Sequence, residues 1–566
     1  MKKEYEYDLV VVGSGAGGLS AACTAAAKGK RVVIIEASEK VGGTTAISGG
    51  MVWIPGNHKM SATASNDLDA ARRYLRGTVG AETDSPNMHA FLTRGDEALR
   101  FLESHTSLRL QSVQYPDYYP DLPGATLGGR VLEPVPFDGA ALGRSFSLLR
   151  DPLPEFLLFG GMMVSRKDLP ILRRVGRSPR AFWHAAKLFT RYMMQRTRFH
   201  RGTTLVLGNA LVARLLKSAL DLKVDFWLQA QAVDLILRKG AVAGVRVHRA
   251  GEEFSLNAPA VVLATGGISH HSDLRQTYVP SAAGNLSATV RSEVTRGGAH
   301  LAQDVGAALS DPATSVEEAL AFWVPVSRFT RTDGTEALFP HTVTDRAKPG
   351  LIAVNQNGQR FVNEAKSYHE FVRAQLSNPQ QNIPAWLVCD ADFLWRYGLG
   401  CIRPFAISVK NELSTGYLKQ ASTVEDLAKL INVPTDSFAE TLRAFNAAAR
   451  QGRDPQYGRG SDMYQRYLGD VEHQPNPCVG TLARAPFCAV AVHPADLGMA
   501  AGILTDEHAR VLGLDGKPIS GLYTCGNDMH SVMQGVYPGP GITLGPALVF
   551  GFIAASHACA NFAPST

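Results

Sequence analysis

A glycine-rich turn between two apolar strands constrains this chain more than any other feature. The strand predicted over 8–12 runs into Gly13-Ser14-Gly15-Ala16-Gly17-Gly18, and a helix of small residues predicted over 19–28 follows. A second apolar run, 31–35, then ends at Glu36. This order of strand, glycine turn, helix, strand and acid predicts a dinucleotide-binding βαβ unit.

Each conspicuous residue of this unit has a separate physical role. Gly13 allows the sharp turn, Gly15 lets the backbone approach a pyrophosphate at the helix N-terminus, and Gly18 lets the helix pack closely on the strand. The carboxylate of Glu36 can accept hydrogen bonds from a ribose 2′-hydroxyl and would repel a 2′-phosphate. The ligand is therefore expected to be FAD or NAD, not NADP. An ordinary tight turn is the alternative interpretation.

Length and composition indicate a multidomain intracellular enzyme. A chain of 566 residues exceeds what one hydrophobic core usually organises, so two domains are expected, one of them interrupted. No apolar run is long enough to cross a membrane, and the N-terminus enters the first strand without a leader, which predicts a cytoplasmic protein. The seven cysteines are scattered without metal-ligand or disulfide spacing. We expect no metal, no disulfide and no nucleic-acid partner.

Positive charge is concentrated in residues 151–201. This segment holds eleven Lys or Arg and three acidic residues, a net charge of +8, whereas the whole chain carries +6. Aromatic and Met residues alternate with the basic ones. Such a segment can lie in a membrane interface with its cations against anionic lipid, which would place the protein peripherally on the inner face of the cytoplasmic membrane. The alternative is a solvated basic helix packed on the protein body.

The remaining pattern predicts an α/β fold. After a helix expected over 204–216, short strands over 224–228, 232–237, 242–247 and 253–256 suggest a small antiparallel layer. An apolar strand over 260–263 ends in Ala264-Thr265-Gly266, and a last strand and a long helix are expected over 521–528 and 541–557. No second glycine fingerprint follows a strand, so a separate NAD(P)H site is not expected.

This order resembles the fumarate-reductase and succinate-dehydrogenase group of flavoproteins over nearly the whole chain. The resemblance implies a Rossmann-like FAD-binding domain (1–314 and 490–566, with the basic apolar insertion at 151–201) and an inserted α+β catalytic domain (315–489). FAD should be bound noncovalently, because the loop 42–50 lacks the histidine that carries covalent FAD in some members. The implied cofactor-binding residues are Gly13, Gly15, Ala16, Gly17, Gly18, Glu36, Gly43, Thr44, Thr45, Ser48, Gly49, Gly50, Ala232, Ala264, Thr265, Gly266, Asn527, Asp528, Thr543 and Leu544.

A proline-flanked glycine near the C-terminus carries the most specific resemblance. The run Tyr537-Pro538-Gly539-Pro540-Gly541 closely resembles a signature of 3-ketosteroid Δ1-dehydrogenases. Two prolines restrict the loop, so Gly541 can present its N–H at a helix start while the Tyr537 hydroxyl supplies a second donor. Two such donors would hold a carbonyl oxygen and stabilise the enolate formed beside it. The alternative is a helix cap with Tyr537 packed as an ordinary aromatic residue.

The same resemblance implies a tyrosine base. The segment Asn363-Glu364-Ala365-Lys366-Ser367 leads to Tyr368, which takes the role of the family's catalytic tyrosine. A phenol has an ordinary pKa of about 10 and needs hydrogen bonds or positive charge to act as a base at neutral pH. A second tyrosine would supply that hydrogen bond, and we prefer Tyr118 while the adjacent Tyr119 stays open. Packing is the alternative role for any of these tyrosines.

The implied reaction is 1,2-dehydrogenation of a 3-ketosteroid, with proton loss from C2 and hydride transfer from C1 to flavin N5. An external acceptor, a quinone or an electron-transfer protein, would reoxidise the flavin. The alternatives are a flavin dehydrogenase or reductase acting at the steroid 4,5 position or on another cyclic enone, a fumarate-type or urocanate-type reductase, and a noncatalytic membrane-associated flavoprotein.

Overall fold

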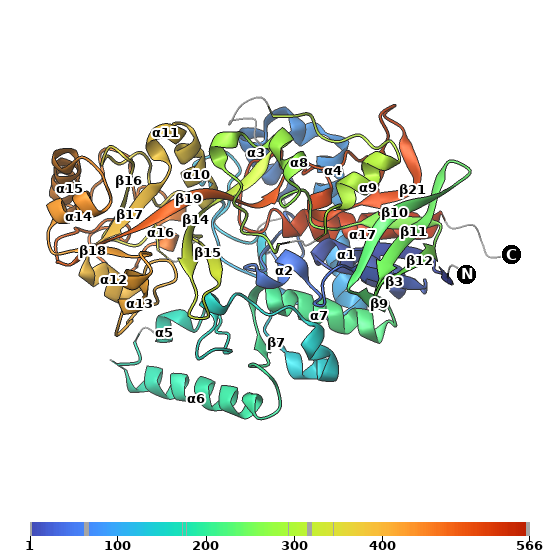
Figure 1. Ribbon diagram of the computed structural model, residues 1–566, viewed down its shortest axis with the longest axis horizontal. Helices are drawn as coiled ribbons and strands as arrows, with labels where there is room; N and C mark the ends of the chain where they lie inside the picture. The colour runs from blue at the N-terminus through green and yellow to red at the C-terminus, as the bar shows by residue number, and fades with distance from the viewer. Residues whose placement is uncertain are drawn as a thin grey trace.

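The fold has two ends joined by one long strand. The computed structural model describes residues 3–60, 67–172, 174–176, 178–291, 294–313, 320–342 and 345–561. In Figure 1 both termini lie at the end that holds the nucleotide-type sheet, while helices α10 to α16 gather at the opposite end. Strand β19 (Phe487–Met499) extends between the two ends. The expected boundary at 489/490 falls inside β19, and the one at 314/315 lies outside the described residues.

The βαβ unit forms where the sequence predicts it. The six-stranded sheet has the order β20-β21-β13-β2-β3-β9, and its strands are parallel from β21 to β9. One face of β2 packs with the helices through Leu9 and Val11, and the other face, with Val10 and Val12, packs with the antiparallel layer. Burial on both faces explains the unbroken apolar runs. The strands are β2 (Leu9–Val12), β3 (Val32–Glu36), β9 (Asp225–Leu228), β13 (Ala260–Leu263), β20 (Arg510–Leu512) and β21 (Pro518–Thr524).

Three helices cover the first face of this sheet. Helix α1 (Ala16–Ala27) lies between α7 (Leu207–Asp221) and α17 (Leu544–Ala560). The Ser20 hydroxyl of α1 donates to the Leu548 carbonyl of α17 at 2.7 Å. The helix expected from 204 begins three residues later, because Thr204–Leu205 pairs with β7, and the helix expected from 541 begins at Leu544.

The antiparallel layer covers the second face and differs from expectation at one strand. β10 (Ala230–Arg238), β11 (Ala241–Arg249) and β12 (Glu252–Asn257) pair antiparallel, and β1 (Lys3–Glu6) joins β12 in parallel. The expected strand over 224–228 is instead β9, the edge of the parallel sheet beside β3. Its short apolar pattern does not distinguish the two sheets, because both pack against the same core.

The opposite end, which holds α10 to α16, contains an α+β unit with an antiparallel sheet. Its sheet has the order β15-β14-β19-β17-β16, with β18 also paired to β19. Helix α10 (Tyr368–Leu376) packs on β14 and β19. The other elements here are β14 (Ala321–Thr330), β15 (Glu336–Pro340), β16 (Leu351–Val354), β17 (Ala385–Cys389), β18 (Lys419–Ala421), α11 (Pro379–Asn382), α12 (Ala391–Tyr397), α13 (Lys410–Ser414), α14 (Val424–Leu430), α15 (Thr435–Ala449) and α16 (Met463–Leu468).

Smaller elements complete the molecule. Helix α6 (Pro179–Arg196) of the basic segment stands at the lower edge of Figure 1, apart from the main body. No helix of the described residues is both long and apolar enough to span a membrane. The remaining elements are β4 (Val52–Trp53), β5 (Leu110–Ser112), β6 (Val131–Pro134), β7 (Phe137–Asp138), β8 (Thr204–Leu205), α2 (Gly43–Ile47), α3 (Asp67–Thr78), α4 (Pro86–His105), α5 (Leu169–Leu172), α8 (Ser272–Tyr278) and α9 (Gly298–Asp304).

Candidate active site

Three of the predicted tyrosines meet in one buried cluster. The hydroxyl of Tyr118 donates to that of Tyr368 at 3.2 Å. Tyr537 stacks on Tyr118 with ring centroids 5.7 Å apart and meets the edge of Tyr368 at 5.2 Å. All three side chains are buried. Three segments that are distant in the chain therefore share one polar centre inside an apolar core. Tyr118 comes from the segment before β6, Tyr368 from the start of α10 and Tyr537 from the loop before α17.

The adjacent tyrosines 118 and 119 point to different partners. The hydroxyl of Tyr119 donates to the Glu370 carboxylate at 2.9 Å, whereas Tyr118 reaches Tyr368. The backbone fixes this choice, because the Tyr118 N–H donates to the Pro538 carbonyl at 2.9 Å. Tyr118 is thus the one of the two that lies beside Tyr368.

The proline-flanked loop contacts the backbone of strand β4 and of Met51 just before it. A Cβ at Gly541, whose φ is +95°, would lie 2.6 Å from the Met51 carbonyl carbon and oxygen. The Gly541 carbonyl accepts from the N–H groups of Trp53 and Gly545. Its own N–H donates to no group in the part of the chain that the structure describes. The loop therefore requires glycine at 541 and leaves one backbone donor beside Tyr537 for a ligand.

Burial has the largest effect on the pKa values of the clustered tyrosines. Burial raises the pKa of Tyr368 well above its ordinary value, with a further increase from the neighbouring Tyr537 phenol, while the hydrogen bond from Tyr118 lowers it. Burial also raises the pKa of Tyr537 to about 12, opposed by hydrogen bonds with Tyr368 and Thr543. The expected lowering by a second tyrosine is present but is outweighed by desolvation in the protein without substrate.

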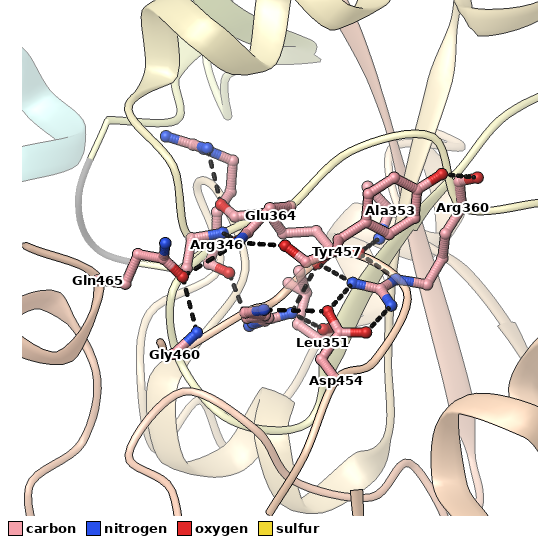
Figure 2. A network of polar contacts seen from close by, with 12 residues as sticks. Arg346, Leu351, Ala353, Arg360, Glu364, Asp454, Tyr457, Gly460 and Gln465 are labelled. Atoms are coloured by element: carbon pink, nitrogen blue, oxygen red, sulfur yellow. Dashed lines mark hydrogen bonds and ion pairs between the residues drawn. The ribbon is translucent and has the colours of Figure 1, made fainter. Parts of the chain in front are cut away.

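The turn before Tyr368 is held by a buried ionic network (Figure 2). Glu364 accepts from Arg360 at 2.7 and 2.8 Å, from Arg459 at 3.1 Å and from the Ala353 N–H at 3.0 Å. Arg360 also binds Asp454 through two hydrogen bonds of 2.8 Å. Tyr368 follows as the first residue of α10, after the Ser367 cap. The network gives a structural reason for the glutamate four residues before this tyrosine.

The glycine turn has the geometry of a phosphate site. Gly13 has a φ of +107°, and a Cβ there would lie 2.1 Å from the Ala264 oxygen. A Cβ at Gly18 would lie 2.0 Å from the Gly13 oxygen, which confirms the close helix-strand packing. Beside Gly15 the nearest atom is the Thr45 hydroxyl at 3.7 Å, so the backbone is open to a ligand. Gly17 instead packs against Cys525.

The acid at the end of β3 is oriented toward the same turn. Glu36 accepts from the Ser14 N–H at 3.1 Å and hydroxyl at 2.5 Å, and from the Ser38 N–H at 2.9 Å. Arg150, which was not predicted from the sequence, donates to the Ser38 hydroxyl at 2.8 Å, while its buried Nε has no hydrogen-bond partner among the described residues. An unpaired buried donor near Glu36 fits the nucleotide part of FAD. A single arginine just before the basic segment gave no signal in the sequence.

The loop predicted to line the flavin ring folds as α2 and the turn after it. The Thr45 hydroxyl accepts from the Ala16 N–H at 3.1 Å, and the Thr44 hydroxyl accepts from the Val290 N–H at 3.0 Å. Space is open beside Gly43 and Gly49, as expected for a cofactor cradle. Ser48 instead bonds the Thr45 carbonyl, and Gly50 is packed on Gly208.

A small cavity of about 20 Å³ lies beside the N-terminal end of α17. Asn527 and Thr543 line it, together with Phe322, whose ring centroid is 5.5 Å from that of Tyr537. Leu544 follows as the first residue of α17.

Thr265 and Asp528, two other predicted cofactor residues, are hydrogen-bonded to each other. The Asp528 carboxylate accepts from the N–H groups of Thr265 and Gly267 and so closes the loop after β13. Burial raises the pKa of Asp528. Gly266 has open space beside it, whereas Ala232 is buried in β10 within the core of the antiparallel layer. A cofactor role for Ala232 stays a prediction.

Comparisons with known proteins identify the family. The model of the FAD binding domain family matches residues 8–544. The chain is 36% identical over 568 residues to the 3-oxosteroid 1-dehydrogenase of Mycobacterium tuberculosis, and the match covers 98% of each chain. This chain belongs to the 3-oxosteroid 1-dehydrogenase family. The family assignment confirms the predicted FAD cofactor and Rossmann-like fold class, and makes the protein an FAD-dependent oxidoreductase.

Two further matches describe the range of this 3-oxosteroid 1-dehydrogenase family. The 4-oxocyclohex-2-ene-1-carboxylate 5-dehydrogenase of Sinomonas cyclohexanicum is 36% identical, over 96% of this chain and 92% of that one. The crystal structure of the 3-ketosteroid Δ1-dehydrogenase from Sterolibacterium denitrificans, in complex with 1,4-androstadiene-3,17-dione, has a TM-score of 0.90 and 34% identity. It covers 98% of this chain and 100% of that chain.

Proposed function

We propose that this protein oxidises 3-ketosteroids across the C1–C2 bond to give 1-ene-3-ketosteroids. The observation that carries the proposal is the buried contact among Tyr118, Tyr368 and Tyr537 beside the free N–H of Gly541. A carbonyl held by Tyr537 and Gly541 would place its neighbouring ring carbon near the Tyr368 phenol. Relatives named as 3-oxosteroid 1-dehydrogenases, and the steroid in the related crystal structure, support the substrate class.

The residues divide the chemistry among themselves. Tyr537 and Gly541 donate hydrogen bonds to the C3 oxygen and stabilise the charge that develops there, and removing one such donor typically costs about 3 kcal/mol of barrier. Tyr368 takes the C2 proton, and Tyr118 donates a hydrogen bond that favours the phenolate. FAD, when bound, supplies the hydride acceptor for C1. The apolar walls exclude water from the developing charge.

Anaerobic mixing tests this function directly. The FAD-loaded protein is mixed with androst-4-ene-3,17-dione and with cholest-4-en-3-one, and flavin bleaching and the product are followed. We expect bleaching with formation of a 1,4-dien-3-one. Tyr368→Phe should keep its FAD and lose most turnover, whereas Tyr523→Phe, whose hydroxyl contacts His557, serves as a matched control. Absence of bleaching with either steroid would refute the proposal.

A small cyclic ketone is the second candidate substrate. It is favoured by the relative named for 4-oxocyclohex-2-ene-1-carboxylate, which matches this chain at 36% identity. Such a substrate carries a carboxylate and would require a cation in the cavity. The nearby guanidinium of Arg346 is already bound to four backbone carbonyls, which disfavours this candidate. Turnover of this acid at a higher kcat/KM than either steroid would reverse the preference.

We further propose that the basic segment docks on an anionic lipid surface, where a lipophilic substrate and a quinone acceptor are available. On α6 the exposed fractions are 71% for Trp183, 68% for Met194 and 54% for Phe182. The exposed basic side chains of Lys187 and Arg191 flank this apolar face. Helices of this composition lie in the interface plane, with apolar residues inserted and cations against lipid phosphates.

Vesicle binding tests this docking. The protein should sediment with vesicles containing about 30% anionic lipid, less so in high salt, as expected for screened charges. Trp183→Glu should weaken the binding, whereas Leu514→Glu alters an equally exposed apolar residue, 83% exposed on the β20–β21 hairpin, and should leave it unchanged. Equal behaviour of the two variants would exclude α6 as the docking surface. Stopped-flow mixing of the reduced protein with a quinone tests the acceptor.

A further inference from the structure

Arg346 is a buried cation next to the tyrosine cluster, and its side chain donates hydrogen bonds to backbone carbonyls. Arg346 is 2% exposed. Its guanidinium donates to the carbonyls of Glu364 at 2.9 Å and Lys366 at 3.1 Å, and to those of His341 and Thr342 at 3.1 Å each. We propose that Arg346 is a positioning residue for Tyr368, fixing the turn that presents its phenol and placing a permanent positive charge beside the cluster.

The geometry gives Arg346 control over the direction of the Tyr368 phenol. Two of its four acceptors lie in the turn 363–367, four and two residues before Tyr368, and the other two lie in the segment after β15. The guanidinium therefore ties this turn to a second segment of the catalytic unit. A displacement of about 1 Å at a reacting group can cost about 10²-fold in rate, so the clamp has leverage on catalysis.

Arg346 differs from the neighbouring buried arginines in its charge balance. Figure 2 shows it beside the network in which Arg360 and Arg459 bind the Glu364 carboxylate directly. Among the described residues, no carboxylate lies within salt-bridge distance of the Arg346 guanidinium. A guanidinium stays protonated in proteins, so its charge is offset there by carbonyl dipoles and not by an ion pair. That charge faces Tyr118, the tyrosine whose hydroxyl donates to Tyr368.

Few charged or titratable groups face Arg346 and Tyr368. Asp345 is bound to His341 at 2.6 Å and Arg459 to Glu364, so both are already paired. His369, beside Tyr537, is neutral because burial lowers its pKa to about 3. Burial raises the pKa of Tyr464, as does Tyr115, while Arg346 lowers it. The groups that face Arg346 are Asp345, Arg459, Tyr464 and Tyr118, and those that face Tyr368 are Tyr118, Tyr464 and Tyr537.

Two substitutions separate the clamp from the charge. Arg346→Gln removes both the clamp and the charge. We expect kcat to fall at least 10²-fold while KM changes less than about threefold. In the pH profile of kcat/KM, the acidic limb should move to higher pH by about one unit. The limb moves up because loss of a nearby cation raises the pKa of the base. Arg346→Lys keeps the charge, so the limb should stay in place while kcat is partly restored. The kinetic isotope effect for C2-deuterated androst-4-ene-3,17-dione should rise in the Gln variant.

Arg214 offers a matched control. Its guanidinium donates to the carbonyls of Ser107, Val135 and Pro136 at 2.7, 3.1 and 3.0 Å, on helix α7 and away from the tyrosines. Arg214→Gln removes a comparable backbone clamp and should leave the acidic limb and the isotope effect unchanged. FAD absorbance confirms that each variant is loaded.

The outcomes decide between positioning and plain structural support. A folded, FAD-loaded Arg346→Gln with native kcat or an unmoved limb overturns the inference. Failure of both Arg346 variants to fold, while Arg214→Gln folds, also overturns it in favour of a structural role. The inference rests on the proposed function, and Tyr368→Phe separates the two. Retained turnover in Tyr368→Phe refutes the base assignment, whereas lost turnover there with native kcat in Arg346→Gln refutes this inference alone.

Discussion

The hydroxyls of Tyr118 and Tyr368 lie 3.2 Å apart although 250 positions separate the two residues in the chain. The contact depends on the loop 537–541, because the Pro538 carbonyl accepts from both the Tyr118 N–H and the Tyr74 hydroxyl. The groups that we propose to hold the substrate and to accept the proton are therefore positioned by one connected set of hydrogen bonds.

Tyr118→Phe should lower kcat/KM by about 10- to 100-fold and move its acidic limb to higher pH, because general-base catalysis depends on the pKa of the base. The hydrogen bond from Tyr118 lowers the pKa of Tyr368, and its loss leaves burial unopposed. Steady-state kinetics from neutral to alkaline pH measure the shift. Tyr119→Phe is the control, since that hydroxyl binds Glu370. Equal losses in both variants would argue against a specific role for Tyr118.

The native enzyme should become more active as pH rises from neutral into the alkaline range. Tyr368 must be deprotonated to act as a base, and burial raises its pKa above the ordinary value of 10. An acid whose pKa is raised is ionised to an increasing extent as pH rises, so kcat/KM should rise over this range. A profile that falls between pH 7 and pH 9 would be inconsistent with a phenolic base.

Gly541→Ala should destabilise the fold and abolish most turnover. A residue with a side chain pays about 1–2 kcal/mol at a left-handed φ, and a Cβ at Gly541 would also lie 2.6 Å from the Met51 carbonyl. Gly516→Ala is the control, because Gly516 has a φ of +74° with open space around it. Urea denaturation and steroid turnover check both variants. Comparable stability losses would show that the close approach to Met51 is unimportant.

Glu36→Gln should weaken FAD binding by about 10- to 100-fold, because hydrogen bonds to charged groups contribute about 1.5–3 kcal/mol. The carboxylate also orders the turn through Ser14 and Ser38. Titration of the apoprotein with FAD, followed by flavin fluorescence, gives the dissociation constant. Glu39→Gln changes an exposed acid three residues away and should bind FAD normally.

Glu364→Gln should reduce the free energy of unfolding by about 3–5 kcal/mol, because it leaves buried arginines without their counter-charge. Glu440→Gln, in an exposed pair with Arg443, should change it by less than about 1 kcal/mol. The pKa of Glu364 is lowered in the fold, chiefly by Arg360 acting against burial. The carboxylate's contribution is thus present above its unfolded pKa of about 4.3 and lost as pH falls through the folded value. Denaturation curves at pH 7 and at a series of pH values below 4 measure this loss.

Local chemistry made the nucleotide unit predictable. Gly13, Gly15, Gly18 and Glu36 act within one supersecondary unit, and the structure gives them the expected turn, opening and close packing. The tyrosines could be proposed only through resemblance to family segments, with 537–541 indicating Tyr537, 363–368 indicating Tyr368 and 115–120 indicating Tyr118, because a tyrosine in an apolar context usually indicates packing. Their convergence depends on contacts between distant segments.

Residues that act through long-range packing gave no sequence signal. Arg346 and Arg150 are single basic residues whose importance comes from burial among carbonyls or beside Glu36. The assignment of 225–228 to the wrong sheet has the same origin, since a short apolar strand fits either layer and tertiary pairing decides. Domain boundaries stay a prediction, because β19 continues through the expected junction.

The packing of α17 on α1 sets an order for assembly. A Cβ at Gly551 would lie 2.5 Å from the Gly17 oxygen, so the two helices meet at backbone contact. Helix α17 begins more than five hundred residues after α1 ends, so it is synthesised much later. The cradle begun by the first thirty residues of this sequence is therefore incomplete until α17 has been synthesised and has packed on α1.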